Sequence, residues 1–531
     1  MVRQEKEKST KMTVSDKEIY DYSSPVTPRR AMFETQRKLV KETGRTRTPA
    51  SDNLMDTELG RERYTRSLPM NCPKQCYAMV GLPARGKSYI AHRLARYLNW
   101  IGTKSKVFNV GQYRRRLVGV NMTYDYYDPF NTTGAQSRRM VANHVLDTII
   151  EWFKEDADNA VAILDATNTT RDRRDLILER CPPEGIQVMF IESVLDDTFI
   201  EERNIREHKL RCPDYQGCDP DDAFNDFSKR IENYKKAYET LCLNLDRELS
   251  FIRVSNITQF HINNLIGTVQ SKSAYFLMNI RPHTKTTLYL SRHGESQFNE
   301  LAKIGGDTNL TDNGVRYAKK LGKFLLENNL TDIPVWTSIM KRTIETCSHL
   351  PNQNVQRYKC LNEIDAGRCD GLTYKEIEET YPEEFALRDL DKYNYRYPQG
   401  ESYQDVCCRL EPIIMDLEKQ DQVLLICHQA VLRCIVGYFL NLSTDEIPYI
   451  KIPLHTVIKI TPLAYGCEKE EISFGVESSV THRDKQTQES IERRLLALDI
   501  SNGDSSFVGH EEEINGNNED VVSDRVVMMA S

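Results

Sequence analysis

A phosphate-binding motif stands in the N-terminal half of the chain. Residues 81–88 read Gly-Leu-Pro-Ala-Arg-Gly-Lys-Ser and fit the pattern GxxxxGK[ST]. In such a motif backbone N–H groups surround phosphate oxygens, the lysine reaches the β- and γ-phosphates and the hydroxyl binds Mg²⁺. An apolar run precedes the motif and an amphipathic one follows it, which favours this interpretation over a glycine-containing turn. We therefore expect Lys87 and Ser88 to bind a nucleoside triphosphate with its magnesium ion.

A carboxylate and several hydroxyl groups follow the apolar run of residues 161–164. Asp165 comes directly after that run and precedes Ala-Thr-Asn-Thr-Thr-Arg. Side chains at the carboxyl ends of parallel strands face the ligand in an α/β sheet. Asp165 is therefore expected either to bind magnesium or to take a proton from an acceptor hydroxyl, and the sequence leaves both roles open. Basic side chains recur where other elements end: Arg114, Arg115, Arg116, Arg138, Arg139, Arg173, Arg174, Lys209 and Arg230.

A second group of residues suits phosphoryl transfer through a histidine. Arg292 and His293 begin an Arg-His-Gly-Glu sequence directly after an apolar run. This sequence at a strand end resembles the histidine-phosphatase superfamily, in which the histidine takes up a phosphoryl group. The step requires cations around the phosphoryl oxygens, a second histidine and an acid for the leaving alcohol. The candidates for these roles are Arg292, Arg342, His428 and Glu363.

Strands and helices alternate around these residues. Apolar runs of strand length cover residues 76–82, 106–110, 160–164 and 187–191, and helical patterns cover 87–100, 137–153 and 171–179. This βαβα order predicts a mostly parallel sheet with helices on both faces. A second series of strands is expected at 286–291, 335–337, 423–427 and 457–461. The predicted fold class is α/β, with two tandem domains that meet near residues 270–285.

The two ends of the chain differ from its middle in composition. Residues 1–70 show no sustained apolar period and hold 15 basic against 11 acidic side chains. Residues 481–531 hold 5 basic against 11 acidic side chains. Such segments bury too little apolar surface to offset the entropy of the chain. We expect a disordered basic tail over 1–70, domains over 71–280 and 281–478, and a disordered acidic tail over 479–531.

Composition argues against several classes of function. The 531 residues carry a net charge of -7, which disfavours general binding to nucleic acid or to membrane surfaces. Residues 1–9 are charged and do not read as a secretory signal. Polar side chains interrupt the most apolar long window, 422–440, which therefore does not predict a bilayer span. The 14 cysteines are scattered and are expected to be reduced thiols, so the predicted location is the cytoplasm.

The local sequences closely resemble those of the bifunctional 6-phosphofructo-2-kinase/fructose-2,6-bisphosphatase family, over roughly residues 70–480. The stretches that carry the resemblance are 81–89, 97–102, 112–115, 165–171, 292–296, 381–389 and 427–431. The resemblance implies an N-terminal P-loop kinase fold and a C-terminal histidine-phosphatase (phosphoglycerate-mutase-like) fold. It also implies an enzyme that makes fructose 2,6-bisphosphate from ATP and fructose 6-phosphate and hydrolyses it again, which regulates glycolysis.

For the kinase half, the resemblance assigns residues to three ligands. The ATP set is Gly81, Leu82, Pro83, Ala84, Arg85, Gly86, Lys87, Ser88, Tyr89, Asn204, Lys209 and Tyr465. The fructose 6-phosphate set is Arg114, Arg138, Thr167, Arg173, Lys209, Arg230 and Tyr234. Ser88 and Asp165 would bind Mg²⁺ together with ATP, while Lys87 and Lys209 would balance charge on the migrating phosphoryl group.

For the phosphatase half, the resemblance makes His293 the phosphorylated residue and Glu363 the proton donor. Arg292, Arg342 and His428 would stabilise the phosphoryl group during transfer. The fructose 2,6-bisphosphate set is Arg292, Asn299, Gly305, Tyr374, Arg388, Lys392, Tyr403, Gln429 and Arg433. The resemblance further implies a homodimer, and protein kinases are expected partners of the tails.

One position departs from the family pattern, and two alternatives to a bifunctional enzyme remain. Leu195 stands where the family commonly has a cysteine near the kinase site, which bears on kinase tuning rather than on kinase chemistry. The alternatives are an enzyme with one working site and a non-catalytic scaffold with two decayed sites. A site that has lost its function would lose its catalytic groups first. The candidate catalytic groups are all present and therefore argue against decayed sites: Lys87, Asp165, His293, Glu363 and His428.

Overall fold

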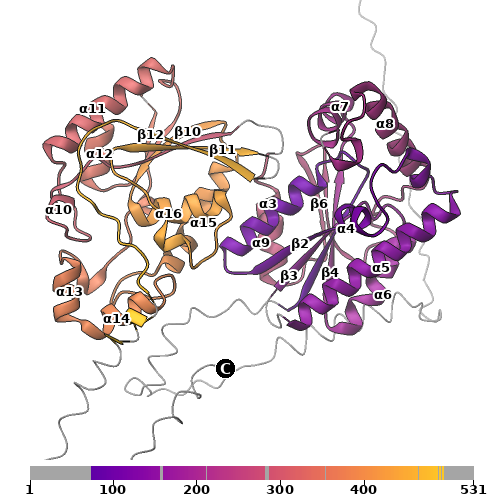
Figure 1. The fold of residues 1–531 in the computed structure, drawn as a ribbon, viewed down its shortest axis with the longest axis horizontal. Helices are drawn as coiled ribbons and strands as arrows, with labels where there is room; N and C mark the ends of the chain where they lie inside the picture. Colours follow the sequence, from indigo (N-terminus) through magenta and orange to yellow (C-terminus); the bar gives the residue numbers. More distant parts are fainter. Residues whose placement is uncertain are drawn as a thin grey trace, which may run out of the picture.

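Two α/β domains follow one another along the chain (Figure 1). The computed structural model describes residues 73–155, 160–210, 212–281, 286–352, 354–463, 466–487, 489–491 and 493–494. The expected N-terminal tail and Tyr465 lie outside this part of the chain. The predicted tandem α/β architecture is confirmed by the two separate sheets. Within the described residues, no helix combines the length and apolarity needed to cross a membrane.

The first domain contains a six-stranded sheet that is parallel except at one edge. The strand order is β2 (Lys104–Asn109), β3 (Ala160–Asp165), β1 (Gln75–Val80), β4 (Gln187–Val194), β5 (Ser250–Ser255) and β6 (Gln259–Asn263). Only the pair of β5 and β6 is antiparallel. The central strands are buried on both faces, which is the burial expected of a parallel sheet covered by helices.

Alternate residues of the central strand point to two different layers of helices. Tyr77 and Met79 of β1 pack toward α3 (Lys87–Trp100) and α9 (Gly267–Leu277). Cys76 and Ala78 pack toward α5 (Thr132–Glu155) and α6 (Arg171–Arg180). The smaller helices are α4 (Val110–Leu117), η1 (Tyr124–Tyr127), η2 (Pro182–Glu184), α7 (Thr198–Asn204), η3 (Ile205–Lys209), η4 (Pro213–Tyr215) and α8 (Pro220–Lys236). The carboxyl edge of the sheet remains accessible to ligands.

The second domain contains a six-stranded mixed sheet. Its order is β12 (Gly466–Ser473), β11 (Thr456–Leu463), β7 (Thr287–Arg292), β10 (Gln422–Cys427), β8 (Val335–Thr337) and β9 (Val355–Arg357). Strands β7, β10, β8 and β9 are parallel, whereas β11 is antiparallel to both neighbours. Arg292 pairs with Cys427, so β7 and β10 end at the same level. His293 and His428 therefore emerge next to each other at the carboxyl edge.

Helices cover both faces of the second sheet. Strand residues Tyr289 and Leu424 pack with α11 (Asp312–Glu327) and α12 (Lys341–Cys347) on one face. Residues Leu288 and Leu425 pack with α15 (Tyr403–Leu417) and α16 (Gln429–Leu440) on the other. The remaining helices are α10 (Gln297–Glu300), η5 (Lys359–Leu361), η6 (Gly367–Cys369), α13 (Tyr374–Thr380), α14 (Pro382–Leu390) and η7 (Ile447–Tyr449).

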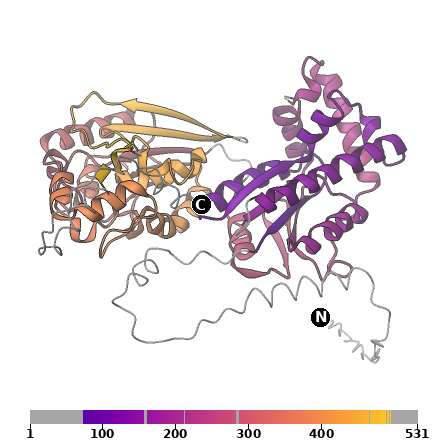
Figure 2. The ribbon, with the colours of Figure 1, turned by 60° about the horizontal axis from the view of Figure 1, so that its bottom comes forward.

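A buried interface joins the domains, and α3 lies at its centre (Figure 1). The indole N–H of Trp100 donates to the carbonyl of Cys434 at 3.0 Å. The guanidinium of Arg96 donates to Glu418 at 2.7 Å, and Arg93 contacts the other oxygen of that carboxylate. The hairpin of β11 and β12 reaches toward the first domain (Figure 2), and its residue Leu463 lines the cavity of that domain.

We predict that Glu418→Gln lowers the free energy of unfolding by about 3–5 kcal/mol, because two buried guanidinium groups lose their counter-charge. Burial alone would raise the pKa of Glu418, but Arg93 and Arg96 outweigh it and hold that pKa below its usual value. The stabilisation is therefore complete above about pH 4.3, the pKa of an unperturbed glutamate, and is lost as the pH falls through the lowered folded value. Urea unfolding followed by tryptophan fluorescence measures the effect.

Glu327→Gln is the matched control, since Glu327 pairs with Lys323 on the exposed surface of α11. Its expected change is within about 0.5 kcal/mol. A change below 1 kcal/mol for Glu418→Gln would mean that the buried ion pairs contribute little to the interface.

Candidate active sites

The phosphate loop lies at the carboxyl end of β1 and leads into α3. Gly81 has φ +131°, and a Cβ there would lie 2.4 Å from the carbonyl oxygen of Ser193. Gly86 has φ +78° and directly precedes the first turn of α3. The loop and the first turn of α3 line a cavity of about 1240 Å³. Free N–H groups at the start of a helix favour anions, so this wall of the cavity suits phosphate.

Most of the predicted ATP residues share this cavity. Pro83, Ala84, Arg85, Gly86, Lys87, Ser88, Tyr89, Asn204 and Lys209 line it. Gly81 and Leu82 form the base of the loop instead, and Tyr465 lies outside the described residues. Burial lowers the pKa of Lys87 to about 7; Asp165 opposes this shift, while Lys209 and Arg85 add to it. The Lys87 ammonium donates to the carbonyl of Leu82 at 2.5 Å. Its nitrogen therefore lies beside the loop that would hold the phosphates.

The predicted magnesium ligands face the same cavity. Asp165 is the last residue of β3 and is 4% exposed. Its carboxylate accepts a hydrogen bond from the side-chain amide of Asn109. Ser88 lies one residue beyond Lys87 in α3. Carboxylate and hydroxyl oxygens are ligands that Mg²⁺ prefers, and in such sites substrate phosphates complete the coordination. The described residues hold no group of three or more His, Cys, Asp or Glu side chains that would bind a metal by itself. The donor set therefore fits a magnesium ion carried with a nucleotide.

All seven residues predicted to bind fructose 6-phosphate line the cavity. They are Arg114, Arg138, Thr167, Arg173, Lys209, Arg230 and Tyr234. Arg114 is 5% exposed and forms an ion pair with Asp214, a residue to which sequence reasoning assigned no role. The guanidinium of Arg230 stacks 3.7 Å from the ring centroid of Tyr127. Burial lowers the pKa of Arg173 to about 10, and nearby Arg138 and Arg139 add to the effect. This concentration of cations suits a second phosphorylated ligand.

The position that departs from the family pattern also lies beside the phosphate loop. Leu195 is 7% exposed and lines a small cavity of about 30 Å³ together with Arg85 and Gly86. Val254 and Leu277 form part of the same wall. The leucine side chain therefore borders the phosphate loop on its apolar side.

The second site is built around two buried histidines. The Nδ1 of His293 lies 2.7 Å from the carbonyl oxygen of Gly294, which can only accept, so Nδ1 carries the proton. The Nε2 lone pair of His293 faces the Nε–H of Arg342 at 3.2 Å. The same N–H approaches Nδ1 of His428 at 3.2 Å, and the two imidazole centroids are 5.2 Å apart. Burial, followed by Arg342, lowers the pKa of both histidines well below 6.5, which keeps them neutral.

Glu363 lies at the N-terminus of α16, close to this pair. One carboxylate oxygen accepts from the N–H of Gln429 and the other from that of Ala430, both at 3.0 Å. Arg292 is 3% exposed and donates to the carbonyl of Ile452 at 3.1 Å. Burial lowers the pKa of Arg292 to about 10, although Glu363 partly opposes this shift. The structure thus brings together all five residues that were predicted to act on the phosphoryl group.

A second cluster of basic side chains, in which Arg388 and Arg433 carry the charge, continues from the histidine pair. Burial lowers the pKa of Lys392 to about 5, and Arg388 and Arg433 lower it further. Arg433 also lowers the pKa of Arg292, so its charge acts on both groups. Tyrosine hydroxyls hold the guanidiniums: Tyr374 and Tyr397 accept from Arg388, and Tyr403 accepts from Arg433. The site therefore contains two cationic centres, which suits a ligand with two separated anionic groups.

The other two predicted sugar-binding positions have structural contacts of their own. Asn299 completes a capping box at the start of α10, where its amide oxygen accepts from the N–H of Ser296 at 3.1 Å. Gly305 has φ +72°, and a Cβ there would overlap the carboxylate of Asp370. Any side chain at this position would displace Asp370, so glycine is required by space as well as by conformation.

The chain after β12 returns across the second site. Thr481 Oγ accepts from Arg292 at 2.7 Å, and His482 Nδ1 lies 3.3 Å from Arg433. Arg483 pairs with Asp389 at 2.8 Å. These contacts were missed because the sequence assigns residues 479–531 to a tail without periodicity. The domain boundary at 478 stays a prediction, and the second domain is contacted by Ser479, Thr481, His482 and Arg483.

Two more buried residues support the histidine loop and were also missed. His455 has φ +56°, is 2% exposed and accepts from the N–H of Glu295 through Nε2 at 3.0 Å. Ser338 lies 2.8 Å from Nε2 of His428. Both residues are distant in sequence from the loop they support, and neither belongs to a local motif that could have identified it.

Comparison with known proteins agrees with this geometry. Residues 64–284 match the family model described as 6-phosphofructo-2-kinase, and residues 288–474 match the histidine phosphatase superfamily (branch 1). A 6-phosphofructo-2-kinase/fructose-2,6-bisphosphatase of Aquarana catesbeiana is 48% identical over 437 residues, which cover 81% of this chain and 92% of that protein. Similar proteins of Rattus norvegicus and Homo sapiens are each 50% identical over 416 residues, covering 78% and 88%. Because both family models match and these relatives are about half identical over most of the chain, the chain belongs to the 6-phosphofructo-2-kinase/fructose-2,6-bisphosphatase family.

Proposed function

We propose that this chain is a bifunctional enzyme with one activity in each domain. The first domain transfers the γ-phosphoryl group of ATP to the 2-hydroxyl of fructose 6-phosphate. The second domain hydrolyses the resulting fructose 2,6-bisphosphate to fructose 6-phosphate and phosphate, and the balance of the two reactions regulates glycolysis. The observation that carries the proposal is that one family member holds the candidate residues for two phosphoryl transfers, one set around the cavity of the first domain and the other around His293.

In the first domain, the proposed transfer depends on positioning and charge. The phosphate loop and the start of α3 hold the nucleotide phosphates, while Arg114, Arg173 and Arg230 hold the 6-phosphate of the sugar. Lys87 and Lys209 balance the charge on the migrating group. Ser88 and Asp165 would hold the magnesium ion, which neutralises charge on the β- and γ-phosphates when it is bound. Asp165 also borders the cavity where the 2-hydroxyl must lose its proton.

In the second domain, the proposed hydrolysis proceeds through a phosphohistidine. Nε2 of His293 attacks the 2-phosphoryl group, so that a P–N bond forms while the bond from phosphorus to the C2 oxygen breaks. Glu363 in its protonated form gives its proton to the leaving oxygen, and Arg292, Arg342 and His428 stabilise the phosphoryl oxygens. Water then attacks phosphorus, the P–N bond breaks and the same carboxylate accepts the proton. Fructose 6-phosphate and phosphate leave the site.

The decisive experiment incubates the purified chain with γ-labelled ATP and fructose 6-phosphate. The proposal expects label in a sugar bisphosphate, transient label on the protein and finally labelled phosphate. Label in the sugar without any on the protein would leave only the kinase working. No transfer of label at all would mean that the kinase is inactive, and unlabelled fructose 2,6-bisphosphate then distinguishes a working phosphatase from the scaffold alternative.

The two cationic centres of the second site lead to a prediction about substrate choice. We expect kcat/KM for hydrolysis of fructose 2,6-bisphosphate to exceed that for fructose 6-phosphate by at least roughly 100-fold, because only the bisphosphate can occupy both centres at once. Steady-state release of phosphate from each sugar measures the ratio. Comparable values for the two sugars would remove the basis for the assignment of Arg388, Lys392 and Arg433 to the distal phosphate.

Three further parts of the proposal rest on family membership. The chain acts in the cytoplasm, forms a homodimer and is modified on its tails by protein kinases. An edge strand supports the homodimer, since β6 ends the first sheet and its unpaired backbone groups can pair with a second copy. Sedimentation of the purified chain over a range of concentrations tests this part.

A further inference from the structure

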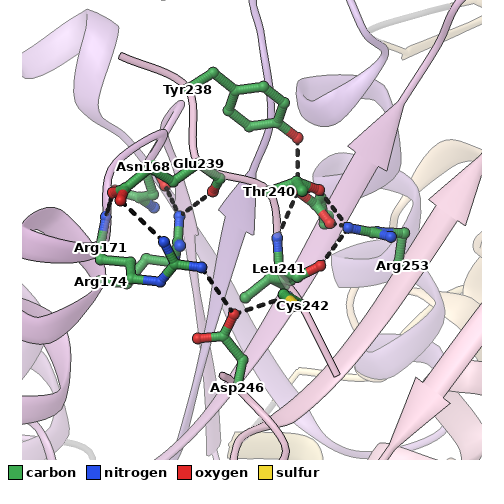
Figure 3. A network of polar contacts seen from close by, with 11 residues as sticks. Asn168, Arg171, Arg174, Tyr238, Glu239, Thr240, Leu241, Cys242, Asp246 and Arg253 are labelled. Atoms are coloured by element: carbon green, nitrogen blue, oxygen red, sulfur yellow. Dashed lines mark hydrogen bonds and ion pairs between the residues drawn. The ribbon is translucent and has the colours of Figure 1, made fainter. Parts of the chain in front are cut away.

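The segment that follows α8 crosses the carboxyl edge of the first sheet and is fixed to β4 (Figure 3). Glu192 of β4 is fully buried, and its carboxylate accepts from the hydroxyls of Tyr238 at 2.6 Å and Thr240 at 2.9 Å. The N–H of Leu241 reaches the same oxygen at 3.2 Å, and Arg253 pairs with the other at 2.6 Å. Three of these donors belong to the segment, so their hydrogen bonds to one buried carboxylate hold the segment in a single position.

The same segment holds the loop after β3 through Glu239 (Figure 3). The N–H of Glu239 donates to the carbonyl of Thr169 at 2.8 Å. The Glu239 carboxylate accepts from the backbone N–H of Arg171 at 2.5 Å and from its guanidinium at 2.9 Å. Arg171 is the first residue of α6, where a negative charge is favourable. The backbone bond from Arg171 is the main reason that the pKa of Glu239 lies below its ordinary value, so the group is ionised at neutral pH.

A buried arginine strengthens this connection. Arg174 is fully buried, and its guanidinium donates to the carbonyls of Glu239 at 2.9 Å and Asn168 at 3.2 Å. On its other side the loop is tied to the phosphate loop, since the N–H of Gly81 donates to Thr167 at 2.8 Å and the amide of Asn168 donates to Met79 at 2.8 Å. The loop between β3 and α6 is therefore held from both sides.

The two elements that Glu239 connects both contribute to the cavity of the first domain. The loop begins directly after Asp165 and carries Thr167, and α8 carries Arg230 and Tyr234. Helix α8 ends at Lys236, three residues before Glu239. We propose that Glu239 is a positioning residue of the kinase reaction, which keeps the sugar-phosphate side chains of α8 in register with the loop that follows Asp165 and carries Thr167. This inference rests on the proposed kinase function of the first domain.

Glu239→Ala is the test variant, and the side chain is exposed enough for the chain to fold without it. We expect kcat/KM for fructose 6-phosphate to fall about ten- to a hundredfold, because a displacement near 1 Å suffices for such a loss. KM for ATP and the hydrolysis of fructose 2,6-bisphosphate stay unchanged. Glu239→Gln keeps one acceptor oxygen for the N–H of Arg171 and recovers part of the loss.

Glu232→Ala is the matched control, since Glu232 lies on the exposed side of α8 and pairs with exposed Lys235. It leaves both kinetic constants unchanged. A second readout is the Kd of fructose 6-phosphate, measured by isothermal titration calorimetry on each full-length protein. It rises in Glu239→Ala and returns toward the original value in Glu239→Gln.

Two results would overturn the inference. The first is a Kd and a kcat/KM for the sugar in Glu239→Ala within twofold of those of the unchanged chain. The second is an equal loss for ATP and for the sugar together with a lower melting temperature, which means a general loss of structure. If the unchanged chain makes no bisphosphate, the proposed kinase function fails, and the Kd values alone then decide whether Glu239 positions the sugar site.

Discussion

His293→Ala is expected to carry no phosphate and to hydrolyse fructose 2,6-bisphosphate at least about 10⁴-fold more slowly than the unchanged chain. The proton of the imidazole lies on Nδ1, beside the carbonyl of Gly294, so the lone pair on Nε2 is free to attack. Burial keeps the ring neutral, and Arg342 faces the same nitrogen at 3.2 Å. Alanine provides no alternative nucleophile at this position, although the surrounding cations remain.

Rapid quenching with substrate labelled at the 2-phosphate measures this prediction. A phosphoramidate is labile in acid and stable in alkali, which distinguishes it from a phosphoserine ester. The unchanged chain should yield acid-labile label, and His293→Ala should yield none. Label that persists in His293→Ala, or that appears on the first domain, would show that the nucleophile is a different residue.

Two neighbouring variants separate the roles of the groups around His293. Glu363→Gln should still form the adduct, but slowly, because the leaving C2 oxygen lacks a proton donor. His428→Ala should slow both formation and breakdown without abolishing the label, because its neutral ring contributes polar contacts, among them that with Arg342, and not a covalent bond to phosphorus. Synthesis of the bisphosphate in the first domain should be unchanged in all three variants, and circular dichroism checks that the second domain still folds.

The central parts of both sites could be predicted because they depend on short local patterns. A glycine-rich turn between an apolar strand and a helix is typical of a phosphate-binding loop. The helix expected after this turn is observed as α3, which begins at Lys87. His293 and His428 each follow an apolar run, and parallel pairing of such runs necessarily brings their ends together. The strand expected at residues 335–337 is also a short apolar run, and it is observed as β8 over the same residues.

The supporting contacts could not be predicted, since they join segments that are distant in sequence. Glu239 lies 68 residues from Arg171, and Glu295 lies 184 residues from Ser479. Their pairing depends on how α8 and the chain after β12 pack, which leaves no periodic signal in the residues themselves. His455 adopts φ +56°, a conformation that its residue type does not indicate. Side chains that position a site are thus harder to identify from sequence than those that perform its chemistry.

Lys87→Ala is expected to lower kcat/KM for synthesis of fructose 2,6-bisphosphate by roughly 10²–10³-fold, the loss typical of removing one group that stabilises a charged transition state. The lysine is buried beside the phosphate loop and faces the cavity that also contains Asp165 and Lys209. Coupled assays of bisphosphate formation measure the loss. Lys154→Ala, which removes a lysine from an exposed ion pair with Glu184, is the control and should retain full activity.

Hydrolysis of fructose 2,6-bisphosphate should be unchanged in Lys87→Ala, and this half of the prediction tests whether the two sites act separately. Lys87 begins α3, whereas Trp100, which contacts the second domain, ends it, so the two lie about 20 Å apart along the helix. Alanine is the best helix former and preserves α3, so the interface residues keep their places. Both activities are assayed on one preparation whose fold is checked by circular dichroism. An equal loss of synthesis and hydrolysis in a folded protein would mean that Lys87 acts on both reactions, and the assignment of one activity to each domain would be wrong.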